Sequence, residues 1–165
     1  MIYQTFAKVS LVSRSKIKVA ILGVGNCASS LVQGLEYYKN DDTENGLISD
    51  VIGGYKVSDI EIVAAFDINK EKVGIDLSEA IFKEPNNTSK FSEVSKLNIE
   101  VKPGKTLDGV GKFVEDKIPV VDDSDKVIDE LIESNAEILV NLLPVGSEEA
   151  VKYLSLIHIS EPTRP

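Results

Sequence analysis

The chain has 165 residues, a formal net charge of −9 and 42% hydrophobic residues. This length fits about one domain with a real core, and the acidic charge argues against nucleic acid or an anionic membrane as the main partner. The single cysteine, Cys27, rules out a disulfide framework and a thiolate metal cluster. No apolar run approaches the ~18 residues of a membrane span, so we expect a cytoplasmic protein.

The first predicted strand, Lys16 to Leu22, reads "KIKVAIL" and ends at a glycine. Its β-branched residues are typical of a buried strand. Apolar residues then recur at helical spacing, which predicts an amphipathic helix from Cys27 to about Lys39. A long polar excursion, Asn40 to Asp59, separates this helix from a second strand, Ile60 to Phe66, which Asp67 ends.

The rest of the chain continues this alternation. The later predicted elements are two short helical pieces in 69–82 that break near Gly74, a loop over 83–98, a weak strand at 99–101, a helix over 125–134 and a strand over 137–143. Asp125 is expected to be the N-cap of the helix over 125–134, and Ser147 to cap a further helix beyond Pro144. Strands that alternate with helices predict a mainly parallel sheet covered on both faces.

The two ends of the chain depart from the pattern. Residues 1–15 are expected to be an N-terminal extension. The last residues, "LSLIHISEPTRP", look like a translated sequencing-adapter sequence. We therefore expect one domain over residues 16–154, and treat residues 155–165, with the lone histidine His158, as a non-native tail.

A glycine-rich loop joins the first strand to the first helix in the order G-x-G-x-x-A. Gly23 permits the tight turn out of the strand, Gly25 lets backbone approach a phosphate, and Ala28 lets the helix pack close to the strand. The helix N-terminus offers unpaired N–H groups and partial positive charge to an anion. This setting predicts a Rossmann-like, doubly wound fold that binds a dinucleotide pyrophosphate. A tight turn without a ligand is the alternative.

Asp67 ends the second strand, where an acidic side chain accepts hydrogen bonds from the adenine ribose of a dinucleotide. It follows Gly23 by 44 residues (67 − 23), about twice the usual offset of ~20, and the long excursion accounts for the excess. A carboxylate there repels a ribose 2′-phosphate, and no arginine follows closely, which favours NAD over NADP. A strand-ending or helix-capping aspartate is the alternative.

Three further features carry weaker hypotheses. Cys27 is a nucleophile candidate because a helix N-terminus favours a thiolate, but no histidine outside the tail serves as its base, so a small residue filling a crowded turn is preferred. Asn86 to Thr88 matches a glycosylation acceptor, which has no consequence in a cytoplasmic chain. Lys102, Lys105 and Lys112 are candidate cations, and solvated surface positions are preferred for them.

Five stretches stand out in chain order: "VAILGVGNCASSLVQGLEYYK", "EIVAAFDINKEKVGIDLSEAIF", "NNT", "TLDGVGK" and "LPVGSEEA". Together they resemble the NAD-dependent inositol-3-phosphate synthases of bacterial and archaeal type (the myo-inositol-1-phosphate synthase family). The resemblance runs from about Lys16 to Leu154. "GVGNCASSLVQG" is far more particular than a generic glycine fingerprint, and the long excursion before the second strand also belongs to this family's pattern.

The resemblance implies an isomerase of inositol and phospholipid biosynthesis that converts glucose 6-phosphate to inositol 3-phosphate. Tightly held NAD oxidises the sugar, the resulting ketone permits aldol cyclisation, and NADH then returns the hydride. The family's catalytic lysines and tetramer interface lie in a later part of the chain. We therefore expect an N-terminal fragment of a homotetrameric parent, without the rest of the cofactor domain and the tetramerisation domain, and without synthase activity of its own.

The resemblance also implies cofactor contacts residue by residue. They are Gly23, Val24, Gly25, Asn26 and Cys27 in the pyrophosphate loop, Asp67 and Asp76 at the adenosine end, Ser134, and Leu143, Pro144 and Ser147 near the nicotinamide. No catalytic or metal-binding residue is assigned. Two other classes stay open, namely the NAD-binding domain of another NAD-linked dehydrogenase and a non-catalytic NAD-binding module.

Overall fold

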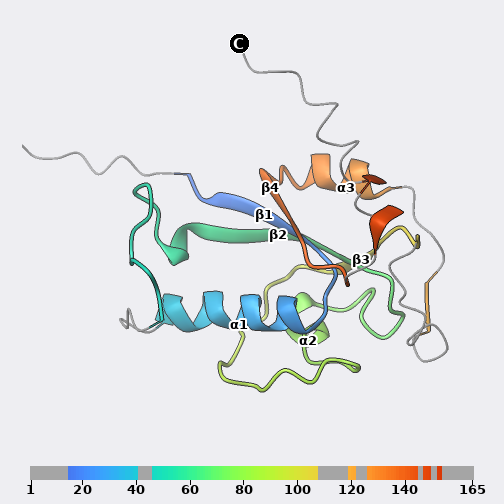
Figure 1. Ribbon diagram of the computed structural model, residues 1–165, viewed down its shortest axis with the longest axis horizontal. Helices are drawn as coiled ribbons and strands as arrows, with labels where there is room; N and C mark the ends of the chain where they lie inside the picture. Colours follow the sequence, from blue (N-terminus) through green and yellow to red (C-terminus); the bar gives the residue numbers. More distant parts are fainter. Residues whose placement is uncertain are drawn as a thin grey trace, which may run out of the picture.

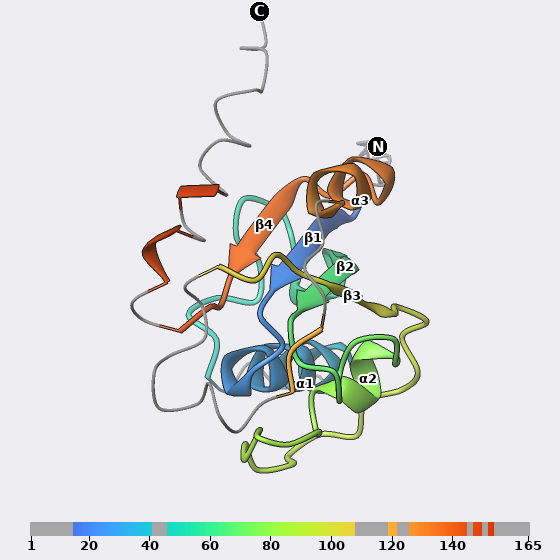
Figure 2. The ribbon, with the colours of Figure 1, turned by 90° about the vertical axis from the view of Figure 1, so that its right-hand side faces the viewer.

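The structure is a computed structural model of the chain, and it describes residues 15–40, 46–107, 119–121, 126–144, 147–149 and 152–153. The described residues form a four-stranded sheet in the order β3-β2-β1-β4, and every strand pair is parallel. Helices cover both faces, with α1 and α2 on one side and α3 on the other (Figures 1 and 2). This is the predicted α/β, Rossmann-like arrangement.

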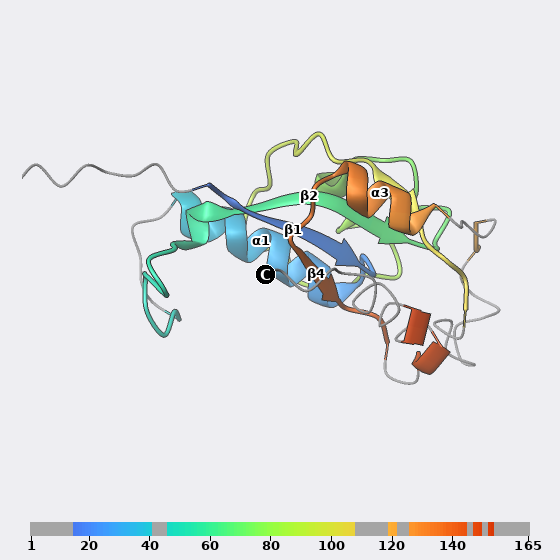
Figure 3. The ribbon, with the colours of Figure 1, turned by 90° about the horizontal axis from the view of Figure 1, so that it is seen from above.

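The strands end together at one edge of the sheet. Their bounds are Ile17–Leu22 for β1, Ile60–Asp67 for β2, Val101–Pro103 for β3 and Ile138–Asn141 for β4. Leu22 pairs with Phe66 on one side and with Asn141 on the other, and Figure 3 shows β1, β2 and β4 pointing the same way. The loops that follow these three strands therefore meet at the carboxyl edge.

Two strand predictions need correction. The weak strand expected at 99–101 begins two residues later, because the main chain of Ile99 and Val101 is engaged with Leu77 and Ile75: the amide of Leu77 donates to Ile99 and that of Val101 donates to Ile75. Pairing with β2 begins only at Val101. The strand expected over 137–143 is shorter, since only Ile138–Asn141 pairs with β1.

The helices are α1 (Asn26–Asn40), α2 (Leu77–Ala80), α3 (Val127–Glu133) and a 3-10 turn, η1 (Val57–Asp59). The predicted break at Gly74 is confirmed, with a φ of +86°, but residues 70–74 form turns rather than a helix. The N-cap of α3 is Lys126, which makes no side-chain cap bond, while Asp125 lies outside the described residues. In the part of the chain that the structure describes, no helix is long and apolar enough to cross a membrane.

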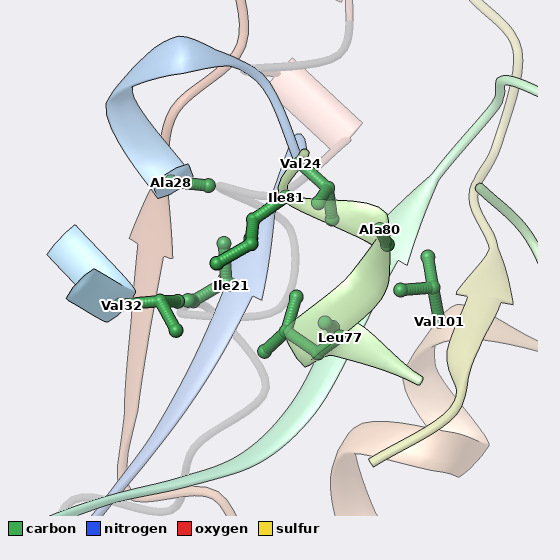
Figure 4. Close-up of a cluster of buried hydrophobic side chains, with 9 residues drawn as sticks. Ile21, Val24, Ala28, Val32, Leu77, Ala80, Ile81 and Val101 are labelled. Carbon is green, nitrogen blue, oxygen red and sulfur yellow. The ribbon is translucent and has the colours of Figure 1, made fainter. Parts of the chain in front are cut away.

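The sheet buries one hydrophobic cluster on each face. The cluster under α1 and α2 contains Ile21, Val24, Ala28, Val32, Ala65, Leu77, Ala80, Ile81 and Val101 (Figure 4). The cluster under α3 contains Ala20, Leu22, Ala64, Phe66, Val127 and Leu131. Successive residues of β1 and β2 alternate between the two, as the pleat requires. Ala28 is fully buried, which confirms that a small residue lets α1 approach the sheet.

Asp76 ties the segment before β3 to α2. Its carboxylate caps α2 through the Ser78 amide at 3.0 Å and also accepts from the Ser78 hydroxyl. The amides of Leu97 and Ile99 donate to it at 3.2 and 3.1 Å. Burial works to raise the pKa of this carboxyl, but the hydrogen bonds from Ser78, Leu97 and Ile99 outweigh it and hold the pKa below its ordinary value.

Replacement of Asp76 by Ala is expected to destabilise the fold by about 1–2 kcal/mol at pH 7, because an N-cap is lost along with two long-range bonds. Since the carboxyl pKa is lowered in the folded state, its contribution is complete above the unfolded aspartate pKa of about 3.9 and is lost as the pH falls through the folded value. Urea unfolding of the wild type and the Asp76→Ala variant from pH 7 downward measures this.

The matched control is Glu79→Ala, which removes an exposed carboxylate from the first turn of the same helix and is expected to change stability by no more than about 0.5 kcal/mol. Equal stability of Asp76→Ala and Glu79→Ala at pH 7 would contradict the assigned role. The role would also be contradicted if the difference in free energy of unfolding between the wild type and Asp76→Ala did not decrease as the pH falls.

Candidate functional site

Gly23 makes the turn out of β1, as the motif predicts. Its φ is +91°, and a Cβ atom there would lie 3.1 Å from the carbonyl oxygen of Leu142. Its amide donates to the carbonyl of Phe66 at 2.9 Å. Backbone conformation and the close approach of the chain after β4 both require glycine at this position.

The fold requires glycine at position 23, but it does not require glycine at position 25. A Cβ atom built on Gly25 meets nothing within 4 Å, and its φ lies outside the left-handed region. The fold itself therefore tolerates a side chain at Gly25. The missing side chain leaves open space directly before α1, whose first residue is Asn26.

Val24, between the two glycines, is held on both sides of its main chain. Its amide donates to Oδ2 of Asp67 at 2.6 Å. Its carbonyl oxygen accepts from Nζ of Lys72 at 2.7 Å and from Nδ2 of Asn86 at 3.1 Å. Its side chain is fully buried in the cluster under α1. The conformation of Val24 is thus fixed by Asp67 at the end of β2, by Lys72 after β2 and by Asn86 after α2.

Lys72 is a site residue that sequence reasoning missed. Its side chain is 2% exposed, and its ammonium also donates to Oδ1 of Asn86 at 2.7 Å. Burial lowers the pKa of Lys72, and the negative charge of Asp67 opposes this shift. Nothing in the sequence separates Lys72 from the exposed Lys70 two residues earlier.

Residues 86–92 cross the start of α1, and we call them the strap. Oδ1 of Asn26 accepts from the amides of Asn87 and Thr88 at 2.8 and 3.1 Å, and from the Thr88 hydroxyl at 2.9 Å. About two turns further along α1, Oε1 of the fully buried Gln33 accepts from the amide of Phe91 at 2.8 Å. The "NNT" triplet, whose only proposed role was an idle glycosylation match, therefore holds the N-terminus of α1.

Asp67 lies beside the loop, as predicted. Its two carboxylate oxygens each accept one internal amide, from Val24 on Oδ2 and from Asn69 on Oδ1 at 2.9 Å. An ionised carboxylate offers about four acceptor positions, so each oxygen retains one. The side chain is half-buried, at the carboxyl end of β2.

The residues after β4 also come to the loop. The amide of Leu142 donates to Leu22 at 2.8 Å, and Leu143 Cδ2 lies 3.3 Å from where a Cβ of Gly23 would stand. Ser147 is buried and donates its hydroxyl to the carbonyl of Pro144 at 2.8 Å. Leu143 thus lies beside Gly23, and Ser147 is bonded to Pro144, the residue that follows Leu143.

One expectation does not agree with the geometry, and a second lies away from the loop. Cys27 does not fill a crowded turn, because its side chain is exposed at the start of α1. Ser134 ends α3 and bonds Leu131, so it precedes the amino end of β4, at the sheet edge opposite to the loop. Strand residues advance about 3.3 Å each, which separates Ser134 from Gly23 by most of the length of β1, and the predicted contact of Ser134 with the cofactor stays a prediction.

Asp76 stands apart from the loop contacts, because the carboxylate is occupied by its internal hydrogen bonds, and its predicted contact with a cofactor stays a prediction. Two of the three candidate cations lie within the residues that the structure describes. Lys102 forms an ion pair with Glu130 at 3.6 Å, and Lys105 lies 5.4 Å from the ring centre of Tyr153. Lys112 lies outside the described residues.

The loop lies where open α/β sheets bind ligands. The crossover through α1 covers one face of the sheet and the helix α3 before β4 covers the other (Figure 2), so the winding reverses between β1 and β4. Ligands of such sheets bind outside the carboxyl ends of the strands at that reversal. Gly23, Gly25 and Leu143 border this point.

Comparison with known proteins identifies relatives. The chain is 51% identical over 143 residues to inositol-3-phosphate synthase of Mycobacterium tuberculosis, covering 84% of this chain and 39% of that protein. It is 51% identical over 142 residues to the synthase of Mycolicibacterium smegmatis, with the same coverage, and 49% identical over 148 residues to that of Corynebacterium glutamicum, covering 86% and 40%. The chain thus spans about two fifths of the length of the curated relatives it matches. No family model matches it.

Solved structures agree with the fold. Ari2 superimposes with a TM-score of 0.71 at 32% identity, covering 88% of this chain and 43% of that one. A myo-inositol-1-phosphate synthase-related protein from Thermotoga maritima superimposes with a TM-score of 0.57 at 24% identity, covering 90% and 41%, and supports the fold alone. The resemblance seen in the sequence motifs is confirmed, and the chain is homologous, over most of its own length, to the inositol-3-phosphate synthases.

Proposed function

We propose that this chain binds NAD at the loop of residues 23–27 and forms the NAD-binding part of an inositol-3-phosphate synthase. The observation that carries the proposal is Gly25. The fold does not need glycine there, so a missing side chain matters only to something that approaches the loop from outside. A dinucleotide pyrophosphate needs such an approach to the backbone before a helix.

The start of α1 supports an anion at that place. The first N–H groups of an α-helix have no partner within the helix, and the first turn of α1 contains no acidic residue. The partial positive charge of this 15-residue helix is therefore not neutralised by its own side chains. Phosphate oxygens are the ligands that this arrangement suits.

Asp67 supports NAD over NADP. Each of its oxygens holds one internal amide and can accept one further donor, which suits the two hydroxyls of an adenine ribose. A ribose 2′-phosphate would bring negative charge against the same carboxylate. Leu143 lies beside Gly23, and we propose that Leu143, Pro144 and Ser147 contact the nicotinamide half.

The reaction of the whole protein is part of the proposal. We propose that the parent isomerises glucose 6-phosphate to inositol 3-phosphate as a homotetramer in the cytoplasm, for inositol and phospholipid biosynthesis. NAD, when bound, would accept a hydride from the sugar and later return it. The residues of this chain would hold and orient that cofactor, and the groups that stabilise negative charge on the substrate would come from elsewhere in the parent. That the 165 residues alone have no turnover stays a prediction.

The first experiment compares Gly25→Ala with Gly34→Ala. Both glycines have open space where a Cβ would stand, but Gly34 lies in the middle of α1. Gly25→Ala is expected to abolish measurable NAD binding in titration calorimetry, because the methyl group occupies the space of the pyrophosphate. It should destabilise the chain by at most about 1 kcal/mol, the scale of a changed N-cap.

Gly34→Ala is expected to bind NAD as tightly as the wild type, and to gain about 0.5–1 kcal/mol of stability from the better helix former. Undiminished NAD affinity in Gly25→Ala would show that the loop is only a structural turn. Equal losses of affinity in both variants would assign the effect to α1 as a whole.

The second experiment tests the choice of cofactor. The wild type is expected to bind NAD at least about tenfold more tightly than NADP, a difference of about 1.4 kcal/mol. Asp67→Asn should narrow that ratio, because the amide keeps one acceptor oxygen and loses the charge. The control is Glu71→Gln, which removes the same charge from an exposed side chain four residues further on. Equal affinity of the wild type for the two cofactors, or narrowing by Glu71→Gln as well, would contradict the role of Asp67.

A further inference from the structure

We propose that Lys72 and Asn86 are positioning residues that orient the Val24–Gly25 peptide so that its N–H faces the bound pyrophosphate. The inference rests on the proposed function, since the orientation matters for binding only if a pyrophosphate sits at the loop. It adds two residues that lie outside the glycine motif, one after β2 and one after α2.

The geometry begins at the carbonyl oxygen of Val24. Nζ of Lys72 and Nδ2 of Asn86 donate to it at 2.7 and 3.1 Å, which matches the two lone pairs of a carbonyl oxygen. In a planar trans peptide the N–H points opposite to the C=O. With the Val24 carbonyl directed at Lys72, the N–H of Gly25 points the opposite way, away from the buried ammonium.

A glycine loop needs such a constraint. Glycine adopts positive and negative φ with similar ease, so the Val24–Gly25 peptide can rotate with little steric penalty if nothing holds it. The rotated peptide would present the Val24 carbonyl oxygen to the phosphates, and two groups bearing negative charge would face each other. Lys72 and Asn86 select the orientation that an anion requires.

The constraint is itself rigidly built. Nδ2 of Asn86 also donates to the carbonyl of Ile81 at 2.9 Å, and Oδ1 accepts from Lys72 at 2.7 Å. Asn86 is thereby fixed between α2 and the ammonium. Lys72 is 2% exposed, and a buried charge is costly unless hydrogen-bonded and paired. The carboxylate of Asp67 supplies the opposite charge and holds the amide of the same Val24.

Lys72→Met tests the proposal in the full 165-residue chain. Methionine keeps an unbranched apolar stem and removes the charge and the donors. The matched control is Lys70→Met, which removes an equal charge from an exposed side chain on the same turn. A second variant, Asn86→Asp, keeps an oxygen for Lys72 and removes the N–H groups given to Val24 and Ile81.

Three measurements separate positioning from general stability. NAD affinity by calorimetry is expected to fall about 10- to 100-fold in Lys72→Met and in Asn86→Asp, and to stay unchanged in Lys70→Met. In the absence of NAD, the carbonyl carbon signal of Val24 and the amide signal of Gly25 should both shift in NMR spectra of the two variants. Other NMR signals of the sheet should stay in place, whereas the loss of a residue that merely stabilises the fold would move signals throughout the sheet. Thermal unfolding of both variants should remain cooperative, which shows that they are folded.

Wild-type NAD affinity in Lys72→Met, or unmoved Val24 and Gly25 signals, would overturn the inference. Should Lys72→Met fail to fold, Asn86→Asp decides by the same two readouts. If the wild type binds NAD and the variants bind it equally well, only this inference fails. If the wild type binds no NAD, the proposed function fails and the inference falls with it.

Discussion

Val24 donates its amide to Asp67 at 2.6 Å and presents its carbonyl oxygen to Lys72 at 2.7 Å, and the rest of the site is built around that double attachment. The two partners carry opposite charges and approach the same residue from the end of β2 and from the turn that follows it. The buried side chain of Val24 adds a third attachment, in the cluster under α1. A loop whose two glycines would otherwise leave it mobile is thereby held in one conformation. The open position at Gly25 and the exposed start of α1 come directly after this anchored residue.

The strap extends the same principle to the helix. Asn26 and Gln33, on α1, take the main-chain amides of residues 87, 88, 91 and 92, so an irregular segment has its polar backbone satisfied by two side chains. These side chains therefore fix where the segment crosses α1. The residues of the "GVGNCASSLVQG" stretch are thus divided between two tasks, since the glycines leave room before the helix while Asn26 and Gln33 anchor the strap.

The sequence predicted β1, α1 and β2 closely, because their periodicities are strong and glycine and aspartate mark their ends. The glycine motif and the strand pattern placed Gly23 and Asp67 at the cofactor loop, and the resemblance alone placed Leu143 there. Lys72 could not be predicted, since Lys70 and Lys72 look alike until the turn after β2 buries one and exposes the other. The strap was missed because "NNT" reads as a polar loop, and only long-range contacts reveal its role. Ser134 was placed at the site by resemblance alone, and because it precedes β4 its contact with the cofactor stays a prediction.

A crystal structure of the chain with NAD bound tests most directly whether the loop is held ready for a dinucleotide. We expect pyrophosphate oxygens within hydrogen-bond distance of the amides of Gly25 and Asn26. We also expect the ribose hydroxyls to bond Asp67, and the Val24 carbonyl to stay directed at Lys72. A pyrophosphate bound away from Gly25, or a Val24 carbonyl turned toward it, would contradict the claim that the loop is held ready for a dinucleotide.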